Sequence, residues 1–214
     1  MQNIQGKNIC GNARVSGNAI VSGMARVSDE AVVSGAAIVS GMAHVTEDAC
    51  VYDRARVSGN AIVSGMARVS DEAHVCGDAR VTGMAYVTDE AIVSGAARVT
   101  GMAHVTGRAR VSDEAIVSGA AIVSGAAIVS GMARMSGAAI VSGIARVSGM
   151  ARVSDEAHVC GDARVTGKAR VSGRAIIGGD AVIMGGRWDG SEGEITTGRW
   201  LAPGVPASDV PGKP

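Results

Sequence analysis

The sequence predicts an all-β protein, a single-stranded parallel β-solenoid, from an uninterrupted six-residue repeat and a composition almost without aromatic residues. From Asn12 to Gly185 the chain of 214 residues consists of 29 consecutive six-residue units with no insertion. Aromatic residues make up only 2% of the chain, although 47% of it is hydrophobic. Because aromatic and branched side chains usually fill a core of ordinary thickness, this core must be thin and built from alanine and valine.

The repeat divides the chain into three segments. Residues 1–11 contain a degenerate unit from Gly6 to Gly11 and are expected to cap the start of the array. Residues 12–185 form the solenoid itself. Residues 186–214 are not repetitive and contain both tryptophans and all four prolines, so we expect a C-terminal cap or a segment that docks a partner.

The order of residues within one unit predicts a very short strand followed by a turn. The second residue is alanine in every unit and the fourth is valine in all but three. These two residues point to one side of a strand, and the residue between them points to the other. The sixth residue is glycine in 22 units and Asp or Glu in the other seven, which is typical of a turn. Glycine at every sixth position argues against a helix.

One unit buries too little apolar surface to be stable alone. We therefore expect each strand to stack, parallel and in register, on the equivalent strand of the next coil, so that stability is summed over neighbouring coils. The spacing alone permits either a triangular coil or a flat, two-sided coil.

The repeat resembles the hexapeptide-repeat, left-handed parallel β-helix family. Val15-Ser16-Gly17-Asn18-Ala19-Ile20 fits that family's pattern in register, and so does Val27-Ser28-Asp29-Glu30-Ala31-Val32. The resemblance covers about four-fifths of the chain and implies a left-handed triangular prism with three units per coil, hence about ten coils. The uninterrupted Ala-x-Val-Ser-Gly pattern is also similar to that of solenoid proteins of bacteria and their phages.

The resemblance implies activities that the sequence does not support further. Many members of the family are acyltransferases that use acetyl-CoA or acyl-carrier protein, and some are carbonic anhydrases. They share a catalytic or metal-binding histidine near a subunit interface, usually with a loop that shapes the pocket. This chain has no such loop between Asn12 and Gly185. We therefore predict no catalytic residue, cofactor or metal site, and keep an acyltransferase with its site between subunits as the alternative.

The four histidines occupy outward middle positions and are interpreted as solvated surface residues. With three units per coil, His44 falls on one face, His74 on a second, and His104 and His158 on the third. The last two lie three coils apart, about 14 Å at the usual strand spacing. Because zinc ligands lie about 2.0–2.1 Å from the metal, no two histidines of one chain can share a zinc ion. A metal site between subunits and a catalytic base are the alternatives.

Acidic pairs recur every seven units and are interpreted as turn-forming, solubilising residues. They are Asp29-Glu30, Asp71-Glu72, Asp113-Glu114 and Asp155-Glu156. Since seven is not a multiple of three, the pairs rotate around the prism and do not form one site. The identical segments 66–83 and 150–167, offset by 14 units, likewise present their histidines on different faces.

One face carries a run of arginines and is a candidate polyanion face. Stacked guanidinium groups repel each other unless counter-charges are near, which corner acids such as Asp155 and Glu156 could supply. The alternative is that the arginine stems cover the sheet while their heads are solvated. The ligand would be nucleic acid or an anionic glycan, and the lack of aromatic stacking platforms counts against single-stranded nucleic acid. The candidate residues are Arg80, Arg98, Arg134, Arg152 and Arg170.

A second face is uncharged at neutral pH and is a candidate self-association face. An exposed apolar ladder on a flat β surface is a plausible contact patch. Members of the resembled family commonly trimerise side by side, so we expect a homo-oligomer, a trimer or a dimer. The face consists of Tyr86, His104, Ile122, Ile140, His158 and Ile176.

The C-terminal segment contains Gly-Arg-Trp twice, around Trp188 and Trp200. The residues between the two copies are compatible with a small hairpin, and the composition after Pro203 indicates extended or disordered chain. Solenoids need their last open edge covered, so the two tryptophans are expected to lie over the final alanine-valine layer. The alternative is that they anchor a protein partner.

The cysteines and the N-terminal residues bear on the cellular location of the protein. The four cysteines show no paired spacing, which indicates free thiols in a reducing, cytoplasmic environment. A phage-encoded or virion-associated protein is the alternative. The N-terminus lacks the apolar stretch of a secretory signal, and no membrane span is expected. The sequence therefore predicts a non-enzymatic structural or interaction solenoid: a rigid scaffold, spacer or binding surface.

Overall fold

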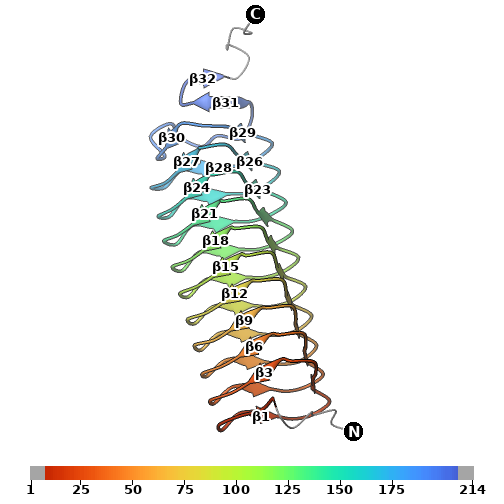
Figure 1. Ribbon diagram of the computed structural model, residues 1–214. Coiled ribbons are helices and arrows are strands. Elements are labelled where there is room, and N and C mark those ends of the chain that lie inside the picture. Colours follow the sequence, from red (N-terminus) through yellow and green to blue (C-terminus); the bar gives the residue numbers. More distant parts are fainter. Residues whose placement is uncertain (1–7, 207–214) are drawn as a thin grey trace, which may run out of the picture.

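The computed structural model describes residues 8–206, so predictions for residues 1–7 and 207–214 lie outside the described residues. The chain winds into a straight stack of similar coils that rises from the N-terminal to the C-terminal end (Figure 1). Residues 8–206 contain strands, almost all of two residues, and no helix. The predicted all-β solenoid of about ten coils is confirmed.

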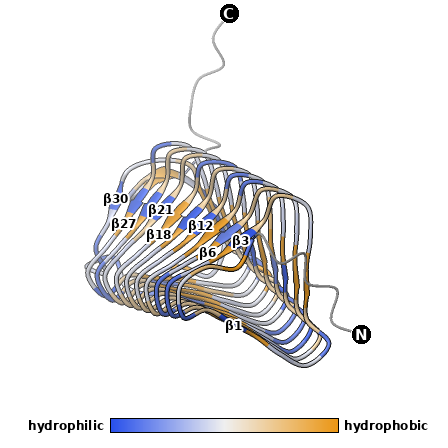
Figure 2. Cartoon of the chain, turned by 60° about the horizontal axis from the view of Figure 1, so that its bottom comes forward, coloured by the Kyte–Doolittle hydropathy of each residue, from blue (hydrophilic) through white to orange (hydrophobic). Residues whose placement is uncertain are grey.

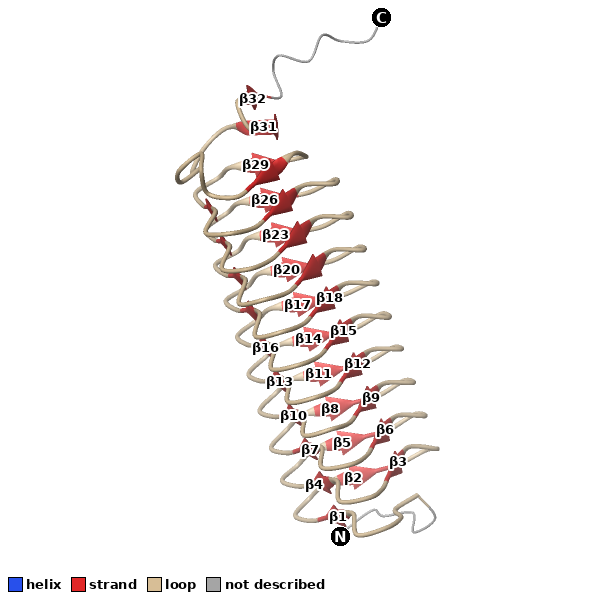
Figure 3. Ribbon diagram, turned by 90° about the vertical axis from the view of Figure 1, so that its left-hand side faces the viewer, coloured by secondary structure: helices blue, strands red, loops and turns tan. Residues whose placement is uncertain are grey.

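The strands form three sheets, one along each face of the prism (Figure 3). Sheet 1 consists of β1 (Arg14–Val15), β4 (Val32–Val33), β7 (Cys50–Val51), β10 (Arg68–Val69), β13 (Tyr86–Val87), β16 (His104–Val105), β19 (Ile122–Val123), β22 (Ile140–Val141), β25 (His158–Val159) and β28 (Ile176–Ile177). Sheet 2 consists of β2 (Ile20–Val21), β5 (Ile38–Val39), β8 (Arg56–Val57), β11 (His74–Val75), β14 (Ile92–Val93), β17 (Arg110–Val111), β20 (Ile128–Val129), β23 (Arg146–Val147), β26 (Arg164–Val165), β29 (Val182–Ile183), β31 (Arg199–Ala202) and β32 (Val205–Pro206). Sheet 3 consists of β3 (Arg26–Val27), β6 (His44–Val45), β9 (Ile62–Val63), β12 (Arg80–Val81), β15 (Arg98–Val99), β18 (Ile116–Val117), β21 (Arg134–Met135), β24 (Arg152–Val153), β27 (Arg170–Val171) and β30 (Arg187–Trp188).

Each strand pairs in parallel with the strand three units later in the sequence. In sheet 2, for example, Arg110 of β17 pairs with Ile128 of β20, an offset of 18 residues. Three units therefore complete one coil, and the flat two-sided coil that the spacing also permitted is excluded. Viewed closer to the axis, the coils follow one another as similar loops, each displaced from the last (Figure 2). The left hand implied by the family resemblance stays a prediction.

The core is one column of small side chains that runs the length of the stack. From Ala19 to Ile183, every inward alanine, valine, isoleucine or methionine of the repeat is at most 2% exposed. Backbone hydrogen bonds join each coil to the next: the Arg110 N–H donates to the carbonyl oxygen of Ala127 at 2.9 Å, for example. Burial of one valine side chain contributes about 1.5–3 kcal/mol, so the stack accumulates its stability coil by coil.

From Gly17 to Gly179 the sixth residue of every unit has a positive φ, which explains the choice of glycine or an acid there. The seven acids at this position all have φ between 58° and 63°. At five of these corners the carboxylate accepts a hydrogen bond from the next coil. The N–H of Gly131, for example, donates to Asp113 at 2.9 Å, and that of Gly173 donates to Asp155 at 3.0 Å. The interpretation of these acids as turn-forming residues is confirmed.

Glycine corners lie too close to the next coil for most side chains. Gly125 has φ of 67°, and a Cβ added to it would lie 2.7 Å from the carbonyl oxygen of Gly143. We expect Gly125→Val to cost about 2 kcal/mol, from the left-handed conformation and this contact together. Gly125→Asp is expected to cost less than half as much, because aspartate adopts this conformation more readily and can bond to the next coil. Urea denaturation of both variants checks the order, and equal losses would contradict it.

The first part of the C-terminal segment continues the coil. Trp188 takes the inward position of β30, which pairs in parallel with β27. Ile195 then forms a parallel bridge to Ile177 of β28. Trp200 takes the inward position of β31, which pairs in parallel with β29. Each Gly-Arg-Trp is therefore a coil strand in which glycine replaces the inward alanine and tryptophan replaces the inward valine.

The expectation of a hairpin between the two Gly-Arg-Trp segments is wrong. Their strands, β30 and β31, lie in different sheets. The antiparallel pair at this end of the chain is instead β31 with β32, joined at Pro203 and Gly204. Gly204 has φ of 72°, a conformation that glycine adopts without strain. The reversal places β32 beside β31 at the end of sheet 2.

Candidate interaction surfaces

The histidines lie on three faces, as the sequence predicted. His44 is in sheet 3, His74 in sheet 2, and His104 and His158 in sheet 1. All four side chains point outward, and the ring of His104 lies against Tyr86 with their centroids 4.9 Å apart. Within residues 8–206, no group of three or more His, Cys, Asp or Glu side chains is arranged to hold a metal ion.

The cysteines of the described chain are all free. Cys10 is exposed, and Cys50, Cys76 and Cys160 are half-buried. They lie on different strands and corners of the prism, and the structure does not bring them together into a site.

The candidate self-association face forms one continuous column in sheet 1. The register pairs Tyr86 with His104, His104 with Ile122, and Ile122 with Ile140. Ile140 pairs with His158, which in turn pairs with Ile176. The guanidinium of Arg68 lies 5.6 Å from the centre of the Tyr86 ring and ends the uncharged column on its N-terminal side.

Sequence reasoning missed an apolar edge beside this column. Met66, Met84 and Met102 occupy equivalent corner positions on successive coils, and they are 53%, 41% and 51% exposed. Each lies two residues before the outward residue of a sheet 1 strand. Met84 and Met102 flank Tyr86 and His104, the first two residues of the column, and Met66 flanks the neighbouring Arg68. Sorting the first residue of each unit at intervals of 18 would have revealed them. We call this column and its methionine edge the sheet 1 strip.

The arginines of sheet 3 stack as the sequence predicted, and the stack is longer than expected. Arg80 pairs with Arg98, and Arg134, Arg152 and Arg170 pair in succession. The register continues from Arg170 to Arg187, which sequence reasoning did not include. Figure 2 labels strands of sheet 3 from β3 to β30, and several of these strands are drawn in blue, the colour of hydrophilic residues. The arginine ladder is defined as Arg134, Arg152, Arg170 and Arg187.

Within residues 8–206, no corner acid forms an ion pair with an arginine of this ladder. The ion pairs found in residues 8–206 join Arg54 with Glu72, Arg108 with Glu90, and Arg174 with Glu156, all at exposed corners. Asp155 accepts hydrogen bonds from the next coil and from Ser154. Neither Asp155 nor Glu156 forms an ion pair with an arginine of the ladder, and Glu156 pairs with Arg174 instead.

Shallow hollows lie over the arginines of sheet 3. One, of about 420 Å³, is lined by Arg134 and Arg152 together with Ile116, Met135 and three serines. A second hollow of about 420 Å³ is lined by Arg80 and Arg98, and here Asp78 and Glu114 are also present. The first hollow is thus bordered by positive charge alone, whereas the second has mixed charge.

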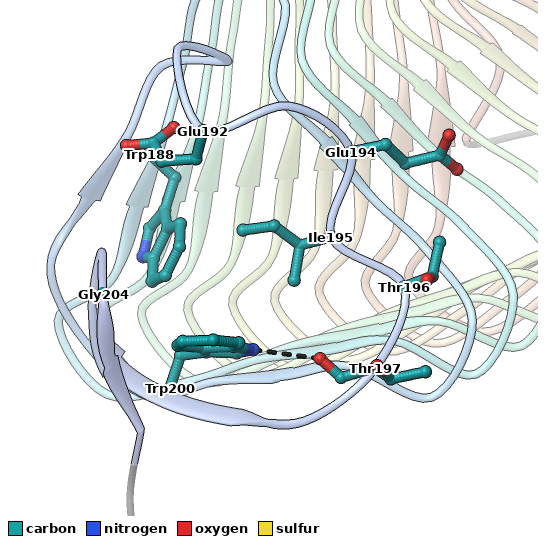
Figure 4. A pocket seen from close by; sticks show the side chains of 8 residues that line it. All are labelled: Trp188, Glu192, Glu194, Ile195, Thr196, Thr197, Trp200 and Gly204. Carbon is teal, nitrogen blue, oxygen red and sulfur yellow. Dashed lines mark hydrogen bonds between the residues drawn. The ribbon is translucent and has the colours of Figure 1, made fainter.

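The two tryptophans meet at the C-terminal end of the core. Trp188 is 1% exposed, and its ring packs edge-to-face against Trp200 with centroids 6.2 Å apart. The indole N–H of Trp188 donates to Gly185 at 2.7 Å, and that of Trp200 donates to Thr197 at 2.9 Å. With Ile195 they line a hollow of about 330 Å³ (Figure 4). The indoles lie over the last layers of the core, and their function as a cap or as an anchor stays a prediction.

An exposed loop follows Trp188 and contains Asp189. Hydrogen bonds from the side chain and backbone of Ser191 lower the pKa of Asp189, and the charge of Arg187 contributes less. Asp189 is therefore ionised at neutral pH, held by Ser191 at the C-terminal end of the arginine ladder.

Comparison with known proteins supports the repeat architecture. The chain is similar to a family model described as YdcK beta solenoid repeat, which matches residues 9–23, 49–65, 55–71, 109–125 and 157–173. No curated protein matches the chain. Residues 8–206 contain no helix with the length and hydrophobicity needed to span a membrane. The chain is thus a β-solenoid repeat protein whose described part is built from strands and turns.

Proposed function

We propose that this β-solenoid is a non-enzymatic, rigid scaffold or spacer that associates with copies of itself through the sheet 1 strip. The observation that carries the proposal is the column of the strip, which contains no Asp, Glu, Lys or Arg from β13 to β28. Exposed Met84 and Met102 lie beside its first two residues, and the ion pair of Arg174 with Glu156 borders its last two. Contiguous apolar surface of this kind marks interaction sites on soluble proteins. A second copy is a suitable partner, because a straight column can face the same column of another prism along its whole length.

The stack of sheets suits a spacer. Each coil contacts mainly its neighbours, and backbone hydrogen bonds join successive coils along all three faces. A solenoid of this type resists bending and presents its outward residues at regular intervals of about 4.8 Å. Such a body can hold two partners, or two copies of itself, at a fixed separation.

Charging the sheet 1 strip tests self-association. We expect Ile122→Arg combined with Ile140→Arg to reduce the assembly to single chains, because the paired arginines would repel the same arginines of the partner copy. Light scattering coupled to gel filtration measures the mass. Ile20→Arg combined with Ile38→Arg is the matched control, since these isoleucines also stack on adjacent coils but lie in sheet 2. The same mass for the wild type and the sheet 1 variant would contradict the proposal.

An acyltransferase with its site between subunits is the alternative. It rests on the resemblance of the repeat to the hexapeptide family, and it requires that the assembled protein bind acetyl-CoA or a related acyl donor. Calorimetry with acetyl-CoA separates the two functions, because a scaffold does not need this ligand. Binding that is lost together with the assembly in the sheet 1 variant would favour the enzyme.

A further inference from the structure

We propose that the arginine ladder binds a linear anionic polysaccharide, laid along sheet 3 parallel to the prism axis. The ladder lies on a different face from the sheet 1 strip, so this binding is independent of self-association. The ligand class is defined by its chemistry: an unbranched sugar polymer with a carboxylate on each residue.

The geometry presents four guanidinium groups in one straight row. Arg134, Arg152, Arg170 and Arg187 are exposed and occupy the same outward position on four successive coils. At the usual strand spacing of about 4.8 Å the row is about 14 Å long. A rigid row of cations at this spacing matches an extended chain whose charges also recur at short, regular intervals.

Three arginines of the ladder, Arg134, Arg152 and Arg170, have no ion-pair partner among residues 8–206. Asp189, which accepts hydrogen bonds from Ser191, interacts electrostatically with Arg187 and so balances charge only at the C-terminal end of the ladder. Four like charges in a row repel each other, and a polyanion removes this repulsion when it binds. A guanidinium group can also donate two parallel hydrogen bonds to one carboxylate in a bidentate geometry.

The surface on both sides of the ladder suits a sugar. Toward one corner lie the exposed side chains of Met132, Met150 and Lys168, each two residues before an arginine of the ladder. Toward the other corner, serines follow the strands, and Ser118, Ser136 and Ser154 line the 420 Å³ hollow. The methionines can pack against the C–H faces of sugar rings, while the serine hydroxyls can bond to ring hydroxyls.

The same surface is poorly suited to nucleic acid. Proteins that bind single strands combine a basic track with aromatic side chains on which the bases stack. The outward residues of sheet 3 are, in the described part of the chain, only arginine, histidine and isoleucine. The aromatic side chain of this sheet, Trp188, is inward and buried. These observations favour the polysaccharide over an oligonucleotide.

A matched pair of double variants tests the proposal. The probe is an oligogalacturonate hexasaccharide, titrated into the full-length protein by calorimetry at low ionic strength, where charge interactions are least screened. We expect Arg152→Gln with Arg170→Gln to weaken binding at least about tenfold, since two charge-assisted contacts are lost. Arg146→Gln with Arg164→Gln is the control, because these arginines also pair on adjacent coils but lie in sheet 2. We expect the control to weaken binding less than about threefold, because these arginines lie on another face and make no direct contact with a ligand on sheet 3.

Several outcomes would overturn the proposal. No heat of binding with the wild-type protein is one, and equal losses in the two double variants are another, because they would indicate unspecific attraction. Equal affinity for maltohexaose, the neutral sugar of the same length, would show that the arginines are not used. Tighter binding of an oligothymidylate of equal charge would assign the ladder to nucleic acid instead. Thermal unfolding by circular dichroism confirms that both variants are folded, and light scattering reports self-association separately.

Discussion

Replacing Val111 with Asp is expected to lower the free energy of unfolding by more than about 4 kcal/mol. Val111 is fully buried in the middle of the stack, where its side chain lies between Val93 and Val129 of the adjacent coils. A carboxylate at this place would be surrounded by methyl groups and would have no hydrogen-bond donor of its own. Since stability passes from each coil to its neighbours, the defect also uncouples the two halves of the array. Urea denaturation followed by circular dichroism measures the loss.

The same strand supplies the control. Arg110 precedes Val111 in β17 and points outward. We expect Arg110→Asp to change the free energy of unfolding by less than about 0.5 kcal/mol, as is usual for a surface substitution. If the two variants unfold at the same urea concentration, the column of small inward side chains is not the source of stability.

Replacing Trp188 with Ala is expected to cost about 3–5 kcal/mol, as for other buried tryptophans. Trp188 is the largest fully buried side chain of the described protein, and it separates the final isoleucines from solvent together with Trp200. Its removal opens a cavity at the end of the core and leaves the carbonyl of Gly185 without the indole donor. Because this coil is the last, the damage should be local. Hydrogen exchange is expected to show lost protection in residues 176–206 and near-normal protection in the first coils.

Two further variants distinguish a cap from a docking segment. Trp200→Ala removes a half-buried side chain and is expected to cost less than Trp188→Ala. Deleting residues 186–214 exposes the last layer of the core and, if the segment is a cap, should reduce both solubility and stability. A deletion variant that is as soluble and as stable as the wild type would show that the segment is not a cap, and would favour docking of a partner.

The repeat made most of the fold predictable from the sequence. Alanine and valine recur with a constant interval, and the backbone at each corner admits few residues, so one unit determines the next. Once three units are assigned to a coil, every outward residue has a defined face. The sequence therefore predicted correctly which outward residues stack with Ile122 and which stack with Arg152.

The C-terminal segment could not be predicted in this way, because its spacing changes. Trp188 stacks on Val171 and Trp200 on Ile183, offsets of 17 residues instead of 18. Counting in sixes fails at the first such step, and two copies of Gly-Arg-Trp then look like the two arms of a hairpin. The useful signal was the order of residue types. In Gly-Arg-Trp, as in Ala-Arg-Val, a small inward residue is followed by an outward arginine and then by a larger inward residue. Recognising it would have placed both tryptophans in the core and Arg187 at the end of the ladder.

The ion-pair and hydrogen-bond partners of the charged side chains could not be predicted from the sequence either. Glu156 could be placed at a corner, but its choice of Arg174 on the next coil depends on side-chain reach. Asp155 could be assigned to a turn, whereas its hydrogen bond to Gly173 depends on the stacking of corners. Such local choices determine which arginines of sheet 3 are left without a counter-charge.

The coil of 18 residues has a consequence for how such a chain can change its length. Gain or loss of three units preserves the exterior, because every later residue returns to its original face. Gain or loss of one unit rotates everything beyond it by a third of a turn, while the interior is unchanged. The identical segments 66–83 and 150–167 illustrate this, since His74 lies in sheet 2 and His158 in sheet 1. Duplication of a stretch of this sequence therefore does not duplicate its surface. Insertion or deletion of one six-residue unit changes which outward residues share a face, while the core keeps the same alanine and valine layers.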